Sequence, residues 1–330
     1  MIFQPAALAL LLAASLNALF LTGTGLFAWQ LLRRWDPASA TERQIGLERR
    51  TWLVSTLVGL VLVASLPALA LFVHNADAMA PFFTGAMCAV GSLQVNAWGM
   101  PALLAQLGLF FLAAAWLVLN HLDRLGWDTP LIRAKYRLLL GLAPLAIVHA
   151  ALLWFYYLNL NPEVITSCCG SLFGPDSGGA AAELAALPAD WARPLYFAGW
   201  LATLAGGVLF LATGRLGRAF GVMSGLHFGA ALVAVLSFVA PYVYEQPNHH
   251  CPFCLLQAEH GHAGWLLYPP LFLGTAAGIG AGLAAAARGH PSLTIAAPRL
   301  ARHLTWVALA GLGGFGLMVL TYMLRSNLIL

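Results

Sequence analysis

Charged residues are scarce in this chain, and their scarcity excludes a water-soluble fold. Only 8% of the 330 residues are Asp, Glu, Lys or Arg, whereas 61% are hydrophobic. Ordinary soluble domains carry roughly 25% charged residues, which form much of their surface. The apolar residues also fall into blocks that can cross a bilayer, for which a helix needs about 20 residues. We therefore expect an integral membrane protein.

The apolar blocks lack the alternation of polar and apolar residues that is typical of outer-membrane strands. Backbone polar groups in lipid must be paired within the segment, so the blocks should be helices. The sequence thus predicts an all-α, polytopic protein with about eight transmembrane helices. The expected spans are 5–32, 51–73, 101–120, 138–158, 195–214, 220–241, 265–287 and 304–324.

Acidic and basic side chains are absent from these expected spans, which argues against an ion-coupled transporter. Only His149 and His227 could titrate inside them. Two such histidines on facing helices could hold a b-type heme, and a polar contact between helices is the alternative role for each. A c-type heme is not expected, because Leu255 rather than a histidine follows Cys254. Dispersed basic residues and the absence of a binding motif argue against a nucleic-acid partner.

The basic residues are concentrated on one side of the predicted membrane protein. Fourteen of the sixteen Lys and Arg residues fall in the loops after the first, third, fifth and seventh spans; only Arg193 and Arg325 lie elsewhere. Basic loops stay in the cytoplasm. We therefore expect a bacterial-type inner-membrane protein with both termini, and all five cysteines, on the extracytoplasmic side.

The chain is expected to divide into two four-helix halves joined by a long loop. Residues 1–158 form the first half with an outward loop that carries Cys88. Residues 159–194 form the loop with Cys168 and Cys169, and residues 195–330 form the second half with the CPFC loop. The seven residues from Cys88 align without gaps on the seven from Cys251, sharing Cys, Leu and Gln. This match is a sign of internal duplication.

The densest group of reactive side chains surrounds the CPFC motif. Two thiols separated by two residues can close a small disulfide or bind one metal ion. Nearby imidazoles would add ligands for Cu or Zn, and methionines in the loop around Cys88 would favour Cu(I) or simply pack. The predicted metal ligands are His249, His250, Cys251, Cys254, His260 and His262, with Cys88 as a further candidate.

The adjacent pair Cys168–Cys169 is the second cysteine motif. Neighbouring cysteines rarely pair with each other, and they suit disulfide exchange with other loops or capture of a soft metal. A redox interpretation makes Cys251 and Cys254 the reactive pair and Cys168 and Cys169 their exchange partners. The alternative is a set of disulfides that only join the loops. Five cysteines cannot all pair within one chain.

The string Cys251-Pro-Phe-Cys-Leu-Leu resembles the active-site CxxC of the vitamin K epoxide reductase homologues and of DsbB. The resemblance implies that this pair opens a transmembrane helix and passes electrons to a quinone. It also implies a loop-borne cysteine pair that exchanges with a periplasmic thiol protein, a role that would fall to Cys168 and Cys169. Those families have four or five helices, and their loop cysteines are not adjacent.

Three functions therefore remain open at the level of the sequence. The first is a membrane-embedded thiol–disulfide redox protein with a quinone as electron acceptor. The second is an extracytoplasmic soft-metal protein that receives Cu or Zn, with a metal chaperone as partner. The third is a structural accessory subunit whose disulfides only stabilise the loops. All three require the lipid bilayer as the immediate surroundings of the helices.

Overall fold

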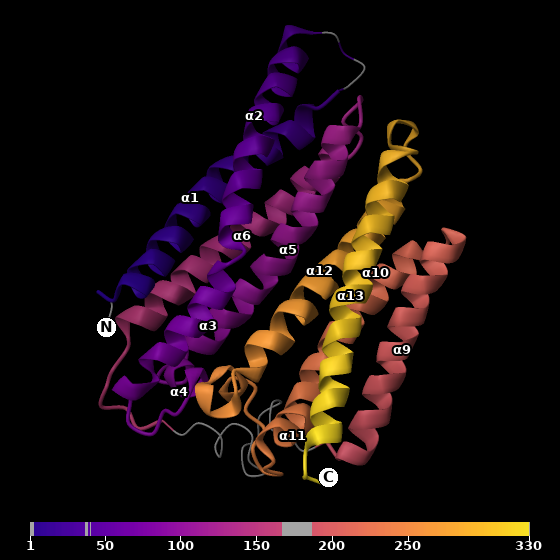
Figure 1. Cartoon of the computed structure of the whole chain (residues 1–330). Helices are drawn as coiled ribbons and strands as arrows, with labels where there is room; N and C mark the ends of the chain where they lie inside the picture. Colours follow the sequence, from indigo (N-terminus) through magenta and orange to yellow (C-terminus); the bar gives the residue numbers. More distant parts are fainter. Residues whose placement is uncertain (1–2, 37–38, 40, 167–186, 330) are drawn as a thin grey trace. The chain divides into compact units, whose positions relative to one another are not determined.

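The computed structural model describes residues 3–36, 39, 41–166 and 187–329, and all regular secondary structure within them is helical (Figure 1). Eight helices in this part of the chain are long and apolar enough to cross a membrane, which confirms the predicted polytopic membrane protein. These spans are Pro5–Arg34, Glu42–Phe82, Gly99–Leu125, Ile132–Leu158, Ala189–Thr213, Gly217–Tyr244, Ala263–Ala287 and Ala296–Arg325. Many large apolar side chains on them are exposed, as contact with lipid requires.

The helices divide into two compact units. The first comprises Met1–Asn75, Leu93–Asn161 and His290–Thr294. In it α1 packs on α2 and α6, and α5 packs on α2 and α6. Its helices are α1 (Pro5–Arg34), α2 (Glu42–Ser65), the larger part of α3 (Ala68–Met79), α5 (Gly99–Leu125), α6 (Ile132–Leu158) and the short η5 (Pro291–Leu293).

A buried ion pair joins α5 to α6 in this unit. The Lys135 ammonium lies 2.6 Å from the Asp123 carboxylate, and the two side chains are 4% and 1% exposed. The ammonium also donates to the Asn120 side chain at 3.2 Å, and Asp123 accepts the Leu131 backbone N–H at 2.8 Å. Both helices extend past their expected spans, so the charges that sequence analysis placed in a loop lie in buried helical turns.

The second unit comprises Ala76–Ser92, Pro162–Gly289 and Ile295–Leu330. In it α12 packs on α10 and α13, and α9 packs on the same two helices. Its longer helices are α9 (Ala189–Thr213), α10 (Gly217–Ala234), α12 (Ala263–Ala287) and α13 (Ala296–Arg325). Its short elements are η1 (Ala80–Phe82), α4 (Ala89–Leu93), the π-helical turn η2 (Val235–Val239), α11 (Ala240–Tyr244), η3 (Cys254–Leu256) and η4 (Ala258–His260).

Glycine lets α10 and α12 touch through their backbones. A Cβ atom added to Gly221 would lie 2.8 Å from the Gly282 Cα, and the reverse is also true. In lipid, helices associate mainly by close packing, and small residues at the contact make this approach possible. The close contact fixes the register of α10 against α12, and η2 and α11 continue α10 towards the CPFC loop.

In each predicted half the outward cysteine lies in a segment of short helices between longer ones. Cys88 lies between α3 and α5, directly before α4, and Cys251 lies between α11 and α12, shortly before η3. The predicted duplication and the predicted division at residues 159–194 stay predictions. The segment that carries Cys88 is part of the second compact unit, together with Cys251 and Cys254. Cys168 and Cys169 lie outside the described residues.

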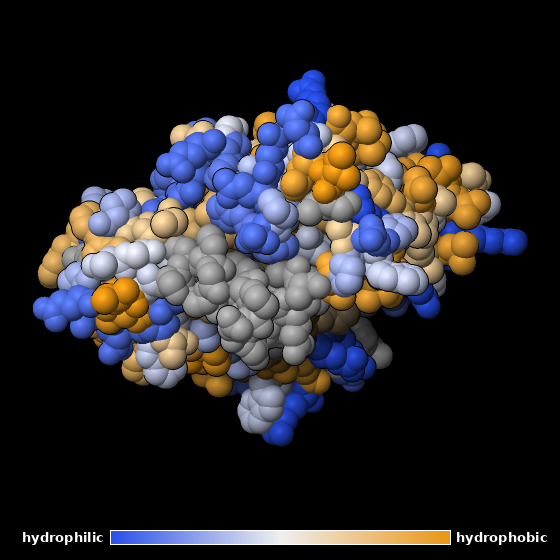
Figure 2. Space-filling model, turned by 90° about the horizontal axis from the view of Figure 1, so that it is seen from below, coloured by the Kyte–Doolittle hydropathy of each residue, from blue (hydrophilic) through white to orange (hydrophobic). Residues whose placement is uncertain are grey.

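The view from below shows hydrophilic residues interspersed with hydrophobic ones (Figure 2). Such a mixture is expected where helices end and loops meet water, because lipid-exposed irregular backbone is excluded from the apolar layer. The loops between the spans therefore provide the polar surface that the helices lack.

Candidate functional site

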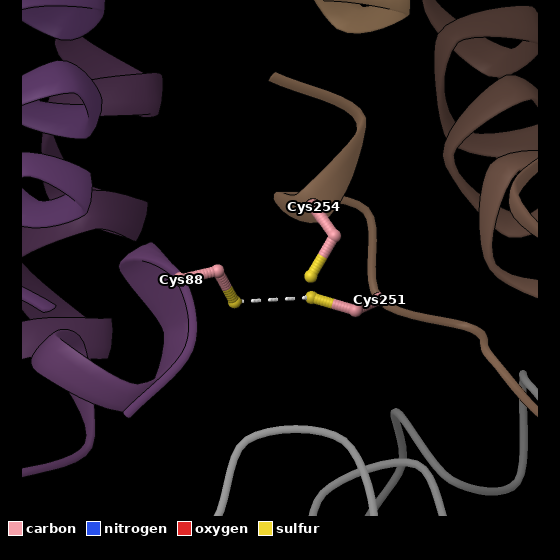
Figure 3. Close-up of side chains that lie close together, drawn as sticks. All are labelled: Cys88, Cys251 and Cys254. Atoms are coloured by element: carbon pink, nitrogen blue, oxygen red, sulfur yellow. Dashed lines mark hydrogen bonds between the residues drawn. The ribbon is translucent and has the colours of Figure 1, made fainter. Parts of the chain in front are cut away.

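Three cysteines from two distant segments converge in the second unit. The Cys88 and Cys251 sulfur atoms lie 3.5 Å apart, and both lie within 4.8 Å of the Cys254 sulfur atom. Figure 3 shows the three side chains turned towards one another. Cys88 and Cys251 are fully buried and Cys254 is 3% exposed. This thiol cluster is the only group of three or more potential metal ligands in the described part of the chain.

The Cys88 segment is held by backbone contacts on both sides. The Asp77 carboxylate accepts the N–H of Ala89 at 3.1 Å, which fixes the residue that follows the cysteine. On the other side of Cys88, the Thr84 backbone carbonyl accepts the N–H of Thr166 at 2.9 Å. Gly85 between them adopts a φ of +84°, a conformation that only glycine adopts at little cost, and a Cβ there would collide with the Thr166 carbonyl.

Gly85→Ala is expected to displace the Cys88 segment. The left-handed backbone alone costs about 1–2 kcal/mol with a Cβ, and the collision with Thr166 adds to it. We expect a lower melting temperature and faster alkylation of Cys88, measured by mass spectrometry of the labelled peptide. Gly199→Ala on α9 is the matched control, because a Cβ there meets nothing within 4 Å. Equal labelling in the two variants would contradict this role of Gly85.

Two tyrosine hydroxyls hold the backbone of the CPFC loop. Tyr244 of α11 donates to the Cys251 carbonyl at 2.5 Å, and Tyr268 of α12 donates to the Pro252 carbonyl. These bonds satisfy carbonyls that would otherwise be orphaned in a mostly apolar region. The sequence pattern did not single out either tyrosine, because neither lies within the CPFC motif or among the predicted Cys and His ligands.

The expectation that the CPFC pair opens a transmembrane helix is wrong. Cys254 begins the short helix η3, and α12 starts only at Ala263. Gly261 and His262 have φ values of +63° and +54°, so a continuous right-handed helix cannot run from Cys254 into α12. The two cysteines therefore occupy an irregular loop, where the backbone can turn both sulfur atoms towards Cys88.

Gln257 connects the two cysteine-bearing segments. Its side-chain amide donates to the Met87 carbonyl at 2.5 Å, and its own carbonyl accepts the N–H groups of His260 and His262. In the sequence this residue is distinguished only by its alignment with Gln94 in the predicted duplication. The Met87 side chain itself is 74% exposed, whereas Met79 is buried.

The histidines predicted as ligands lie in the loop before and after the CPFC motif and are not members of the thiol cluster. His250 and His262 each hold a backbone carbonyl through Nδ1, those of Leu236 and Leu256, at 2.7 and 2.8 Å. A carbonyl only accepts, so Nδ1 is the protonated nitrogen in both rings, and Nε2 of a neutral ring keeps its lone pair.

His249 and His260 form a second small group with Tyr244. Each imidazole ring lies 4.2 Å from the Tyr244 ring, and the two imidazoles are 5.8 Å apart, measured between ring centroids. Burial and the neighbouring His249 lower the pKa of His260, although Glu259 opposes the shift. The neutral imidazole, which is the form that can bind a metal, is therefore favoured at this position.

The immediate surroundings of the thiol cluster are apolar. All three cysteines belong to one buried hydrophobic cluster of the second unit, together with residues such as Val90, Val239 and Leu255. A charged thiolate in such surroundings needs a compensating charge. A bound cation can supply that charge, because metal ions are often the largest local charges in a site.

No protein-family model, no curated protein and no solved structure matches the chain. The function must therefore be inferred from the residues of the thiol cluster and from the part of the fold that positions them.

Proposed function

We propose that the chain is a membrane protein that binds a soft metal ion, with Cu(I) as the best fit, through Cys88, Cys251 and Cys254. The observation that carries this proposal is the convergence of three buried sulfur atoms within 4.8 Å of one another. Three sulfurs that bind one metal at about 2.3 Å lie roughly 3.8–4.0 Å apart. Small side-chain movements would bring the cluster to that geometry.

The choice of Cu(I) follows from the kind and number of ligands. Thiolates select soft ions such as Cu(I) and zinc. Structural zinc sites are almost always four-coordinate, whereas the cluster supplies three sulfur atoms and no imidazole. Three sulfur ligands suffice for Cu(I), and its single positive charge would offset the charge of one thiolate in the apolar surroundings.

Metal analysis of the purified protein tests the proposal directly. After anaerobic reconstitution with Cu(I) and removal of excess metal, we expect about one copper per chain. X-ray absorption should show sulfur ligands at about 2.3 Å. Cys251→Ser should lose the bound copper. Protein that retains no copper, or that binds it equally well without Cys251, would rule the proposal out.

The charge distribution supports an extracytoplasmic position for this site. Arg215 and Arg218 lie at the start of α10, and the chain passes through α10, η2 and α11 before it reaches Cys251. Basic residues favour the cytoplasm. Cys251 and Cys254 come after the other end of this span, which therefore faces away from the cytoplasm. We infer that copper arrives from the extracytoplasmic side of an inner membrane, delivered by a metal chaperone.

His249 and His260 are proposed to receive the metal before the cysteines bind it. Both half-buried imidazoles lie 4.2 Å from the Tyr244 ring, whose hydroxyl holds the Cys251 backbone, so we propose that the metal passes them on its way to the thiol cluster. The double variant His249→Ala/His260→Ala should slow copper loading by about 10-fold, in line with the effects of outer-shell partners. Stopped-flow measurement of loading gives the rate, and equilibrium competition gives the affinity.

His262→Ala is the matched control for that pair, because its ring binds the Leu256 carbonyl through Nδ1 and is absent from the Tyr244 group. Loading at the wild-type rate in the double variant would remove both histidines from the path. A loss of final occupancy would instead make them ligands, as the sequence pattern predicted.

A thiol–disulfide function is the second candidate, favoured by the 3.5 Å separation of the Cys88 and Cys251 sulfur atoms. A disulfide needs about 2.05 Å, so a modest movement would allow Cys251 to pair with Cys88 or Cys254. Oxidation of two thiols to one disulfide releases two electrons and two protons. A quinone that takes up both becomes a quinol, as the resemblance to the CxxC families implies.

In the redox proposal Cys168 and Cys169 exchange with this centre and with a periplasmic thiol protein. Thr166, which bonds to Thr84, precedes Cys168 by two residues in the sequence. Thiol trapping before lysis, followed by mass spectrometry, tests the exchange. Disulfides that mild reductant leaves intact would favour the structural accessory subunit instead, since structural disulfides resist reduction.

A further inference from the structure

Three buried polar groups in the helix bundle of the second unit have no hydrogen-bond partner among the described residues. They are both ring nitrogens of His227, the Tyr196 hydroxyl and the Thr275 hydroxyl. The three side chains are 3%, 2% and 1% exposed. Most buried polar atoms in folded proteins are hydrogen-bonded, so each such exception calls for a physical explanation.

The contacts between α10 and α12 place His227 and Thr275 at the same level. Gly221 meets Gly282, Ser224 meets Gly278, and the Phe228 and Phe272 rings lie 5.1 Å apart. The two helices are therefore antiparallel, with a register that drifts by about one turn or less along the contact. The Ser224–Gly278 pair, continued by three residues along each helix, places Thr275 near the level of His227.

Tyr196 of α9 lies at this level as well. Its ring stacks on the His227 imidazole with centroids 5.5 Å apart and an interplanar angle of 29°. Three helices thus each contribute one unsatisfied polar side chain to one layer of the bundle. If unsatisfied polar groups arose by chance, they would lie at different levels along the helices, whereas a ligand site places them at one level.

Aromatic side chains that pack on Tyr196 cannot satisfy its hydroxyl. The Tyr196 ring contacts Phe238 and Phe315, with centroids 5.8 and 6.3 Å away. In the bilayer interior, polar groups have no bulk water to bind. The turn η2, where the backbone pattern changes from α to π, begins two helical turns after His227. Such π-turns frequently accompany functional sites.

We propose that His227, Tyr196 and Thr275 form a buried site for a small neutral molecule that both donates and accepts hydrogen bonds, with water as its occupant. A neutral imidazole offers one donor and one acceptor, and each hydroxyl offers both. Buried water typically makes about three hydrogen bonds to otherwise unsatisfied groups. The site does not depend on metal binding at the thiol cluster.

Near-isosteric removal of the hydroxyls tests the site, because a bound water and a dry layer predict opposite signs. If water bridges the groups, Tyr196→Phe and Thr275→Val should each lower the melting temperature by about 2–4 °C. If the layer is dry, each substitution removes an unsatisfied polar atom and should raise the melting temperature.

A double-variant cycle adds a second, independent readout. The effects of Tyr196→Phe and His227→Phe should be non-additive if one water joins the two side chains. Thr203→Val is the matched control, because its hydroxyl already donates to the Gly199 carbonyl and should not couple to His227.

Nitrogen NMR of the His227 ring completes the test. Assignment by comparison with His227→Gln should give at least one water-bonded ring nitrogen in the hydrated site. Raised melting temperatures together with two non-bonded ring nitrogens would overturn the proposal, whatever the outcome of the copper measurements.

Discussion

Cys88→Ser is expected to reduce the Cu(I) affinity by about 100-fold or more. Loss of an outer-shell partner already costs about 10–100-fold at metal sites, and Cys88 is a proposed direct ligand. The hydroxyl of serine is a hard donor that Cu(I) binds poorly. Competition with a chromophoric Cu(I) chelator under anaerobic conditions measures the change.

This variant is informative because Cys88 lies outside the CPFC motif. Its sulfur atom reaches the pair only through the tertiary contact to Cys251, across a sequence separation of 163 residues. If the pair alone bound copper, Cys88→Ser would leave the affinity unchanged. Cys88→Ala is a second variant of similar size without a hydroxyl. A loss of affinity in both variants cannot come from burial of the serine hydroxyl.

The double variant Cys168→Ser/Cys169→Ser is the matched control in the same assay. The copper proposal expects it to retain the wild-type affinity, because its ligands are Cys88, Cys251 and Cys254. The redox proposal expects this variant to block disulfide exchange. Wild-type affinity in Cys88→Ser would contradict a three-sulfur site regardless of the result with the control.

Lys135→Met is expected to lower the free energy of unfolding by about 3–5 kcal/mol. Removal of one member of a buried ion pair leaves the other charge uncompensated. The remaining Asp123 carboxylate is 1% exposed and keeps only its bond to the Leu131 N–H. Denaturant titration of the protein in detergent micelles measures the loss.

The double variant Lys135→Met/Asp123→Leu distinguishes a buried charge from a general packing defect. Apolar replacement of a whole buried ion pair is often neutral or stabilising. The second substitution should therefore recover most of the stability lost in the first. An unchanged stability in Lys135→Met would show that the pair is hydrated and contributes little.

The transmembrane organisation was predictable because hydropathy is a local property. A run such as 138–158 identifies a spanning helix without knowledge of its neighbours. The helix ends were less predictable. The observed α6 begins at Ile132, because Lys135 finds Asp123 and Asn120 as partners and can remain in a buried turn.

The residue types of the candidate site were predictable, and the predicted histidine ligands stay a prediction. The CPFC motif and Cys88 were both candidates from the sequence, but the neighbouring histidines were expected to join them. The structure instead uses His250 and His262 to hold backbone carbonyls, and it places Cys88 against Cys251. Sequence proximity to a thiol does not orient an imidazole towards it.

The sequence by itself determined that this protein is helical, spans a membrane repeatedly and carries its cysteines between the apolar runs. Composition and the length of apolar runs are sufficient for those conclusions. Only the tertiary structure decided that Cys88, Cys251 and Cys254 form one cluster, because their approach depends on bonds such as Gln257 to Met87 and Tyr244 to Cys251. Such contacts join residues whose spacing along the chain carries no periodic signal.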